Sequence, residues 1–134
     1  MTSPQSFSTG IAHQIGRYAD AVKVPAGYEQ ILVSGTPGLT ADGSLPEEFS
    51  QEAMQAWRNV AAALSRAGAE LTDIVSVRQW LTSADDIPVY AAVRAEVIKH
   101  EPASMLAVIP GLVWPRFRVE IEVIAVRPPS GAAA

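Results

Sequence analysis

The chain has 134 residues, of which 49% are hydrophobic and 18% are charged, and its formal net charge is −4. This length is that of one domain, and the apolar content excludes an intrinsically disordered protein. The sequence contains no cysteine, which excludes disulfides, thiolate catalysis and Cys-ligated zinc. We expect a single domain over residues 1–134, structured over about residues 11–127, with flexible termini.

The distribution of charged and apolar residues also limits the partners. The 10 Lys and Arg residues are scattered, whereas nucleic-acid binding needs a basic stripe. No apolar stretch is long enough to cross a membrane, and the N-terminus has neither the basic region nor the apolar core of a secretory signal. His13 and His100 are too far apart in sequence to make a metal-ligand motif. The sequence therefore predicts a cytoplasmic protein with no membrane, nucleic-acid or metal partner.

Two short strands are predicted at the start of the domain. Residues 18–24 (YADAVKV) alternate in polarity, and residues 28–35 (YEQILVSG) contain three consecutive apolar residues before a closing glycine. The sequence Pro25-Ala26-Gly27 between them is typical of the turn in a β-hairpin. Residues 36–48 are rich in turn-forming residues and are expected to form a loop.

A long helix is predicted after this loop. Apolar residues recur at helical spacing, and polar residues fill the other side. Ser50 is a candidate N-cap, and Gly68 is a candidate left-handed cap at the C-terminal end. The apolar stripe, whose tryptophan we place in the core, consists of Phe49, Ala53, Trp57, Val60, Ala61 and Leu64.

The rest of the chain contains three more strands and one more helix. The strands are predicted over residues 73–81, 104–109 and 117–126, and the helix over residues 83–100, which begin with acidic residues and a proline. The order is therefore β-β-α-β-α-β-β, which belongs to the α+β class. Helices that connect strands in this way favour parallel pairing, and both helices fall on one face of a mixed sheet.

The face of the sheet that the helices leave uncovered has an unusual composition. It has too many apolar residues for a solvent face and too many charged residues for a dry core. We infer that this face packs against another subunit, and that its polar groups are paired there or line a cleft. The residues assigned to it are Ile74, Ser76, Arg78, Trp80, Arg118, Glu120, Glu122, Ile124 and Val126.

Five segments in this order resemble the Rid family, also called the YjgF family and formerly endoribonuclease L-PSP. They are IGRYADAVKV (15–24), ILVSGTPG (31–38), NVAAALSRAGAELTDIVSVRQWL (59–81), EPAS (101–104) and VEIEVIAV (119–126). The resemblance implies a chorismate-mutase-like α+β fold and a homotrimer with a central barrel and three small-molecule clefts between subunits. It also implies hydrolysis of reactive imines and enamines, such as 2-iminopropanoate and 2-iminobutanoate, without a cofactor or metal.

The resemblance further implies a set of site residues. Tyr18 takes the place of the family's pocket tyrosine, and Ser34 and Gly35 match a Ser-Gly pair at the end of the second strand. Glu120 matches a glutamate that orients water, so we expect Tyr18 and Glu120 to be catalytic. Ser104 replaces the arginine with which the deaminating members bind the substrate carboxylate, and serine cannot supply that charge.

The missing arginine leaves the substrate-binding cation open. Ser34, Gly35 and Ser104 are expected to line the cleft, and Trp80 and Trp114 to reach it, the latter from the loop over residues 109–116. Either the substrate is not an α-imino acid, or another arginine binds it. The candidates are Arg17, Arg78, Arg116 and Arg118.

Two functions are compatible with these residues. The first is a cofactor-independent hydrolase of an enamine or imine, in which Glu120 guides water onto the substrate. The second is a non-enzymatic trimer that binds a small ligand or a partner protein in the same clefts. For Glu120 the structural alternative is a salt bridge with Arg78 or Arg118, and Glu122 is expected to be structural. Ribonuclease activity is disfavoured by the net charge of −4.

Overall fold

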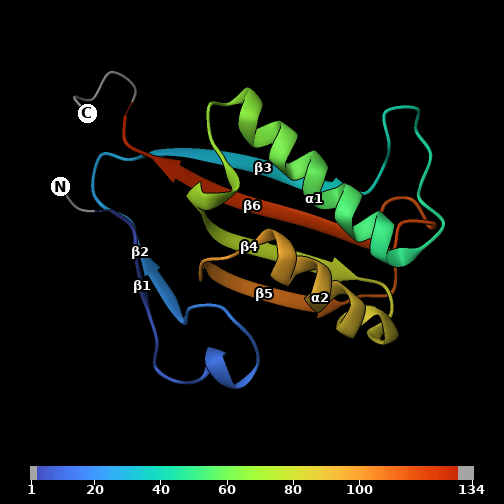
Figure 1. The fold of residues 1–134 in the computed structure, drawn as a ribbon, viewed down its shortest axis with the longest axis horizontal. Coiled ribbons are helices and arrows are strands. Elements are labelled where there is room, and N and C mark those ends of the chain that lie inside the picture. The colour runs from blue at the N-terminus through green and yellow to red at the C-terminus, as the bar shows by residue number, and fades with distance from the viewer. Residues whose placement is uncertain (1–2, 130–134) are drawn as a thin grey trace.

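A four-stranded mixed sheet is the centre of the structure, a computed structural model that describes residues 3–129 (Figure 1). Its strands are β3 (Glu29–Pro37), β4 (Ile74–Leu81), β5 (Ala103–Val108) and β6 (Val119–Arg127), in the spatial order β3-β6-β4-β5. Strand β6 is antiparallel to both of its neighbours, whereas β4 and β5 are parallel. This arrangement confirms the predicted mixed sheet and the parallel pairing across the second helix.

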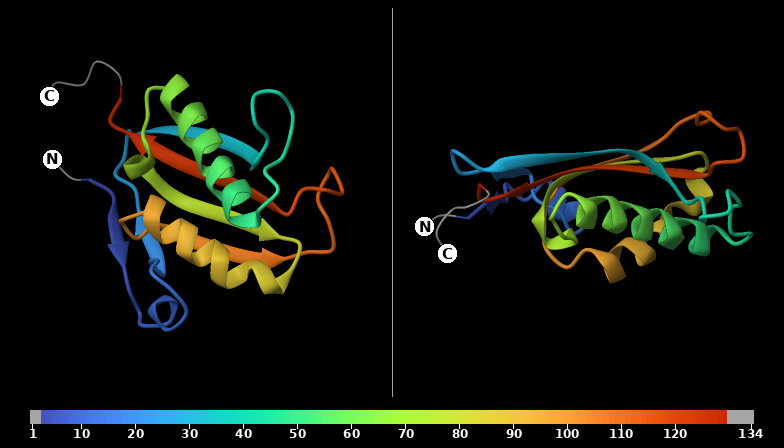
Figure 2. Two further views of the ribbon diagram at one scale, coloured as in Figure 1. Left: turned by 45° about the vertical axis from the view of Figure 1, so that its right-hand side comes forward. Right: turned by 90° about the horizontal axis from the view of Figure 1, so that it is seen from above.

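Both helices, α1 (Phe49–Arg66) and α2 (Ile87–Val97), lie on one face of this sheet, as the right-hand view of Figure 2 shows. The predicted apolar stripe of α1 faces the sheet, and its Trp57 and Leu64 are buried. The core on the sheet side comes from alternate residues of β6, because successive side chains of a strand point to opposite faces. Those buried residues are Val119, Ile121, Val123 and Ala125.

The helix ends differ in part from the predicted ones. The N-cap of α1 is Glu48, so the prediction of Ser50 is wrong: that residue already lies in the first helical turn. Gly68 has a φ of +80°, which confirms the left-handed cap after α1. The second helix is shorter than predicted, because a separate 3₁₀ turn (Ala84–Asp86) precedes α2 and Ile98 is already extended.

The predicted hairpin between the first two strands is wrong. Strand β2 (Ala21–Lys23) pairs with an additional short strand, β1 (Gln5–Phe7), and the two form a separate ribbon. Strand β3 pairs with β6, at the other end of the sequence. The turn signal at Gly27 is real, since its φ is +85°, but it redirects the chain from one sheet to another. The element order is therefore β-β-β-α-β-α-β-β.

The face opposite the helices is uncovered, as predicted, but two assigned residues are buried. Ile74 is 1% exposed because the pairing register between β4 and β6 shifts between Ile74 and Ser76, which turns its side chain away from this face. Val126 is 3% exposed and lies with Val22 and Tyr28 along a cavity beside the β1–β2 ribbon.

Candidate functional site

Glu120 lies near the start of β6, paired with Pro37 of β3 on one side and Trp80 of β4 on the other. Its side chain is half-buried, and its carboxylate has no hydrogen-bond or ion-pair partner among residues 3–129. Burial raises the pKa of the Glu120 carboxyl above its ordinary value, because desolvation disfavours the charged form. An unpaired carboxylate with a raised pKa is suited to accept a proton from water.

A β-bulge in β3 brings Gly35 against this carboxylate. Strand β3 pairs Val33 with Val123 and Thr36 with Ile121, so Ser34 and Gly35 together contain one extra residue. A Cβ atom at position 35 would lie 2.6 Å from Glu120 Oε1, which makes glycine necessary for this close approach. The structure therefore places Ser34, Gly35 and Glu120 together.

Tyr18 lies at the opposite end of the sheet. Its neighbour Ala19 forms a parallel bridge with Ala103, and the Ala19 N–H donates to the Pro102 carbonyl at 3.0 Å. This contact places the half-buried Tyr18 beside the beginning of β5, the strand that contains Ser104. Strand β4 separates β5 from β6 (Figure 1). Glu120 pairs with Trp80 near the end of β4, whereas Ala103, beside Tyr18, pairs with Ser76 near its beginning. One subunit therefore does not bring Tyr18 and Glu120 together.

Ser104 points toward the helix side of the sheet, where it joins a buried polar network. Gln79 Nε2 donates to Ser104 Oγ at 3.0 Å and to the Met105 carbonyl at 2.7 Å. The Tyr90 hydroxyl of α2 donates to Gln79 Oε1 at 2.6 Å. Burial raises the pKa of Tyr90, so its hydroxyl remains a donor. Sequence reasoning missed Gln79 and Tyr90, although a glutamine at an inward-facing position of β4 was the available signal.

Arg118 does not lie on the uncovered face, contrary to the prediction. Its Nε donates to Glu52 Oε1 at 2.6 Å, its backbone N–H donates to Glu52 Oε2 at 2.9 Å, and its Nη2 donates to the Glu47 carbonyl at 3.0 Å. Glu52 belongs to α1 and is fully buried. Strand β6 begins at Val119, so its side chains do not alternate between the two faces as far back as residue 118. The prediction therefore assigned Arg118 to the wrong face. The guanidinium of Arg118 is occupied by protein acceptors.

Arg78 and Glu122 pair with each other on the uncovered face. They are opposite residues of β4 and β6, and Arg78 Nη1 lies 3.8 Å from Glu122 Oε1. Both side chains are substantially exposed, so the pair contributes at most about 1 kcal/mol. Neither Arg78 nor Arg118 forms an ion pair with Glu120, so the salt-bridge alternative is not found within one subunit.

The three remaining predicted site residues, Trp114, Arg116 and Arg17, also lie at different ends of the sheet. At the Glu120 end, the guanidinium of Arg116 lies 5.0 Å from the ring centroid of Trp114, and this ring stacks on Phe117 at a centroid distance of 5.0 Å. At the Tyr18 end, Arg17 Nη2 donates to the Lys99 carbonyl at 3.3 Å. The predicted site residues thus form two groups. The Glu120 group is Ser34, Gly35, Trp114, Arg116 and Glu120, and the Tyr18 group is Arg17, Tyr18 and Ser104.

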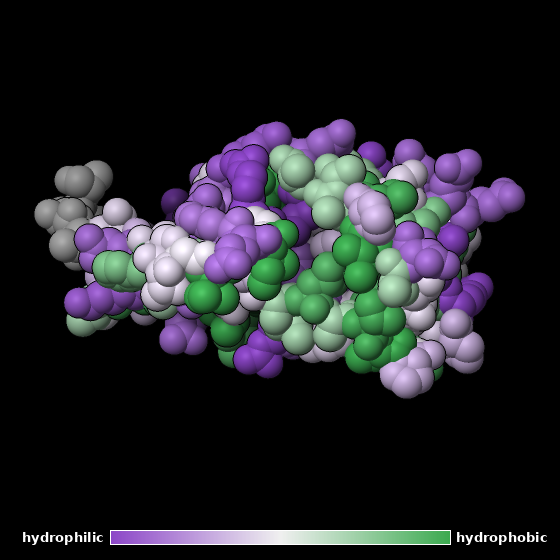
Figure 3. All heavy atoms as spheres, turned by 90° about the horizontal axis from the view of Figure 1, so that it is seen from below, coloured by the Kyte–Doolittle hydropathy of each residue, from purple (hydrophilic) through white to green (hydrophobic). Residues whose placement is uncertain are grey.

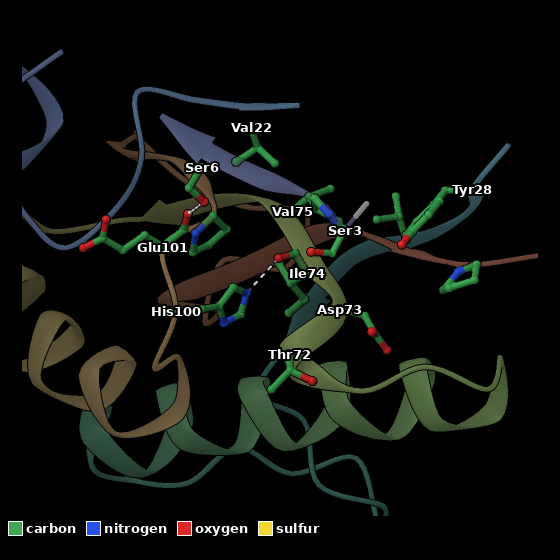
Figure 4. Close-up of a pocket in the computed structure, with 14 residues that line it drawn as sticks. Ser3, Ser6, Val22, Tyr28, Thr72, Asp73, Ile74, Val75, His100 and Glu101 are labelled. Atoms are coloured by element: carbon green, nitrogen blue, oxygen red, sulfur yellow. Dashed lines mark hydrogen bonds between the residues drawn. The ribbon is translucent and has the colours of Figure 1, made fainter. Parts of the chain in front are cut away.

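No residue of either group lines the described cavities. One of about 420 Å³ opens beside the β1–β2 ribbon, and in it His100 Nε2 and the Ile74 carbonyl are 2.8 Å apart (Figure 4). A depression of about 240 Å³ on the uncovered face is lined by Leu32, Arg78 and Glu122, among others. Within residues 3–129, no group of three or more His, Asp or Glu side chains is arranged to hold a metal. In the same range, neither helix has the length and apolarity needed to cross a membrane.

The chain matches known proteins over nearly its whole length. The family model described as Endoribonuclease L-PSP matches residues 10–127. A Dermatophagoides farinae protein named 2-iminobutanoate/2-iminopropanoate deaminase is 29% identical over 129 residues, which cover 94% of this chain and 98% of that protein.

Solved structures share the fold. The crystal structure of RidA from the Antarctic bacterium Psychrobacter sp. PAMC 21119 is 27% identical with a TM-score of 0.71, covering 95% of this chain and 100% of that one. YyfB from Yersinia pestis, a protein of unknown function in the Rid family, has a TM-score of 0.82 at 20% identity, covering 94% of this chain and 100% of that one. These matches confirm the predicted fold class. The chain belongs to the Endoribonuclease L-PSP family, that is, to the Rid or YjgF proteins.

Proposed function

We propose that this protein is a cofactor-independent hydrolase of small imines or enamines, with a substrate range that differs from that of the 2-iminobutanoate deaminases. Membership of the Rid family and the deaminase name of the Dermatophagoides farinae relative support the reaction class. The observation that carries the proposal is the half-buried carboxylate of Glu120, unpaired among residues 3–129 and held against the bulge at Ser34 and Gly35.

In the proposed reaction, Glu120 takes a proton from a water molecule as the water oxygen adds to the carbon of the C=N bond. The imine nitrogen takes up a proton, and the resulting carbinolamine releases ammonia and leaves a carbonyl compound. Backbone N–H groups that the bulge frees from strand pairing, near Ser34 and Gly35, are suited to polarise the substrate. Tyr18 supplies a hydroxyl donor from a neighbouring subunit.

The proposed working form is a homotrimer with its clefts between subunits. This assembly brings the Tyr18 group of one subunit to the Glu120 group of another, which a single subunit keeps at opposite ends of the sheet. Apolar side chains on the uncovered face and along β5 need a partner surface, and Figure 3 shows hydrophobic residues gathered along the β5 edge. They include Leu32, Met105, Leu106 and Val108. We place this trimer in the cytoplasm, without membrane or nucleic-acid partners.

The substrate range follows from Ser104. This neutral residue is hydrogen-bonded to Gln79 and cannot form a charge-assisted contact with a substrate carboxylate. Losing such a contact costs roughly 1.5–3 kcal/mol, or one to two orders of magnitude in rate. We therefore expect little turnover of 2-iminobutanoate and 2-iminopropanoate, whose α-carboxylate finds no arginine at position 104.

The test is to measure ammonia release from a panel of imines generated in situ, with and without the α-carboxylate. Glu120→Gln should abolish turnover while the trimer persists in analytical ultracentrifugation. Glu122→Gln is the matched control, because Glu122 lies two residues along the same strand and pairs with Arg78. Equal turnover by wild type and Glu120→Gln on every imine would contradict the proposal.

A second candidate is a non-enzymatic trimer that binds a small ligand or a partner protein. The observation that favours it is the replacement of a charged cleft residue by Ser104, whose hydroxyl is tied to the interior. If this candidate is correct, no imine in the panel is hydrolysed, and Glu120→Gln weakens assembly instead of chemistry.

A further inference from the structure

Arg94 has an unusual environment in the second helix. It lies one turn after Tyr90 in α2, and its Nε and Nη2 atoms are buried without a hydrogen-bond partner among residues 3–129. Its third nitrogen, Nη1, donates to the Arg17 carbonyl at 3.4 Å. An unpaired buried charge is costly, so such groups are normally paired or bound to a ligand.

The two unpartnered atoms belong to the same edge of the guanidinium. The N–H bonds of Nε and Nη2 point in the same direction and form a planar fork. This fork matches the two oxygens of a carboxylate, and such a bidentate contact is among the strongest hydrogen-bonded arrangements in proteins. Within the part of the chain that the structure describes, the whole fork of Arg94 therefore meets no protein acceptor.

The groups around this fork do not supply the missing negative charge. Burial lowers the pKa of Arg94, and the nearby charge of Arg17 lowers it further, while Tyr90 and Tyr18 oppose this effect. None of these neighbours is a carboxylate. The segment that holds Arg17 and Tyr18 lies against the guanidinium, so binding of an anion at the buried fork requires this segment to move.

We propose that the Nε–Nη2 edge of Arg94 binds a carboxylate that comes from outside residues 3–129, beside Tyr18. The carboxylate belongs either to a small organic acid or to an Asp or Glu side chain of a second copy of the chain. In the first case Arg94 is a substrate-binding residue of the hydrolase, a reading that rests on the proposed function. The binding of a carboxylate itself does not depend on that function.

The probe is acetate, titrated against the whole protein with chloride at equal ionic strength as the reference. The Nε–H resonance of Arg94 in ¹H–¹⁵N spectra should shift saturably with acetate and not with chloride, and acetate should raise Tm. The resonance is assigned from its loss in Arg94→Gln. Arg58→Gln, an exposed substitution in α1, should behave as wild type.

Substitutions of Arg94 show whether acetate needs the paired N–H donors of the fork or only the positive charge. Arg94→Gln should lose the acetate-dependent rise in Tm, and Arg94→Lys should bind acetate roughly tenfold more weakly, because an ammonium group cannot form the fork. If Arg94→Gln does not fold, Arg94→Lys serves in its place: it also lacks the Nε–H resonance, which gives the assignment, and its oligomeric state tests the second-copy case. A wild-type resonance that responds equally to acetate and chloride, with no change of assembly in Arg94→Gln, overturns the proposal.

Two further comparisons identify the source of the carboxylate and distinguish this proposal from the proposed hydrolase function. If a second copy supplies the carboxylate, Arg94→Gln lowers the oligomeric state in sedimentation, and acetate shifts nothing in the intact wild-type assembly. If a small acid supplies it, the variant assembles normally and acetate binds. Glu120→Gln should still bind acetate while losing turnover, so imine hydrolysis and carboxylate binding fail independently.

Discussion

The two ends of the sheet carry opposite unmet charges. At one end, the Glu120 carboxylate faces a bulge that contains Gly35 and forms no ion pair with any of residues 3–129. At the other end, the Arg94 guanidinium lies against the Tyr18 segment and forms no ion pair within the same range. Each end has a group that needs a partner of the other charge or a substrate, and β4 keeps them apart within one subunit. This difference is the basis of our proposal that a complete site forms only with a second copy of the chain.

The largest expected effect comes from removing the anchor of the Glu120 end. Glu52→Ala leaves Arg118 without its carboxylate and frees the start of β6, two residues before Glu120. Breaking one side of a buried ion pair costs about 3–5 kcal/mol, and the lower end applies because Arg118 is partly exposed. Urea denaturation measures the loss of unfolding free energy. Arg78→Ala, which breaks the exposed pair with Glu122, should cost at most about 1 kcal/mol. Equal losses in the two variants would contradict this difference.

The next prediction concerns the position of the Glu120 carboxylate and its effect on turnover, not the stability of the fold. Gly35→Ala puts a Cβ atom 2.6 Å from Glu120 Oε1 and forces the carboxylate to move. Moving a catalytic group by about 1 Å lowers the rate roughly 100-fold, so imine turnover should fall by about that factor. Gly111→Ala is the control, because nothing lies within 4 Å of its added Cβ and its turnover should stay at the wild-type level. A fully active Gly35→Ala would remove Glu120 from the reaction.

A smaller effect is expected in the buried polar network between β4 and α2. Tyr90→Phe removes the hydrogen bond to Gln79 Oε1 and leaves a buried acceptor unsatisfied, which costs roughly 1–3 kcal/mol. The double variant Tyr90→Phe/Gln79→Leu removes both partners, so thermal denaturation should show that it recovers part of this loss. If the double variant loses the sum of the two single losses, the Tyr90–Gln79 contact is not the source of the stability.

The smallest effect is the pH dependence of the Glu120 carboxyl. Its pKa is raised in the folded protein, so its stabilising contribution is complete below the unfolded pKa and is lost as the pH rises through the folded value. Glu120→Gln should therefore be more stable than wild type at neutral pH, and this advantage should shrink as the pH falls through the folded pKa. The difference in Tm between the two proteins, measured from pH 7 to about pH 4, checks the sign. An advantage that grows toward acid pH would contradict the raised pKa.

Periodicity predicted the elements that pack locally. The apolar stripe of α1 and the alternation of β6 gave the core correctly, because each depends on residues close in sequence. The pairing of β3 with β6 escaped prediction, since strand order depends on contacts between distant parts of the chain. The register shift after Ile74 was not predicted either, because the alternation of polar and apolar residues in the sequence does not reveal a β-bulge.

The candidate site was predicted in part. Glu120, Ser34 and Gly35 were named from a family resemblance, and the structure places them together. Arg94 was not predicted because an arginine in a helix is ordinarily a solvated side chain, and only the packing of the Tyr18 segment shows that its Nε and Nη2 atoms are buried. The separation of Tyr18 and Glu120 at opposite ends of the sheet was not predicted, since it follows from strand order.

Subunit complementation tests most directly whether Glu120 and Tyr18 from different copies form one site. Glu120→Gln and Tyr18→Phe are each purified, mixed, dissociated and reassembled, and the imine that wild type hydrolyses fastest is then assayed. The account predicts that each variant alone is impaired and that the mixed trimers regain turnover, because some clefts then combine an intact Glu120 with an intact Tyr18. A mixture that is no more active than the average of the two variants would contradict it.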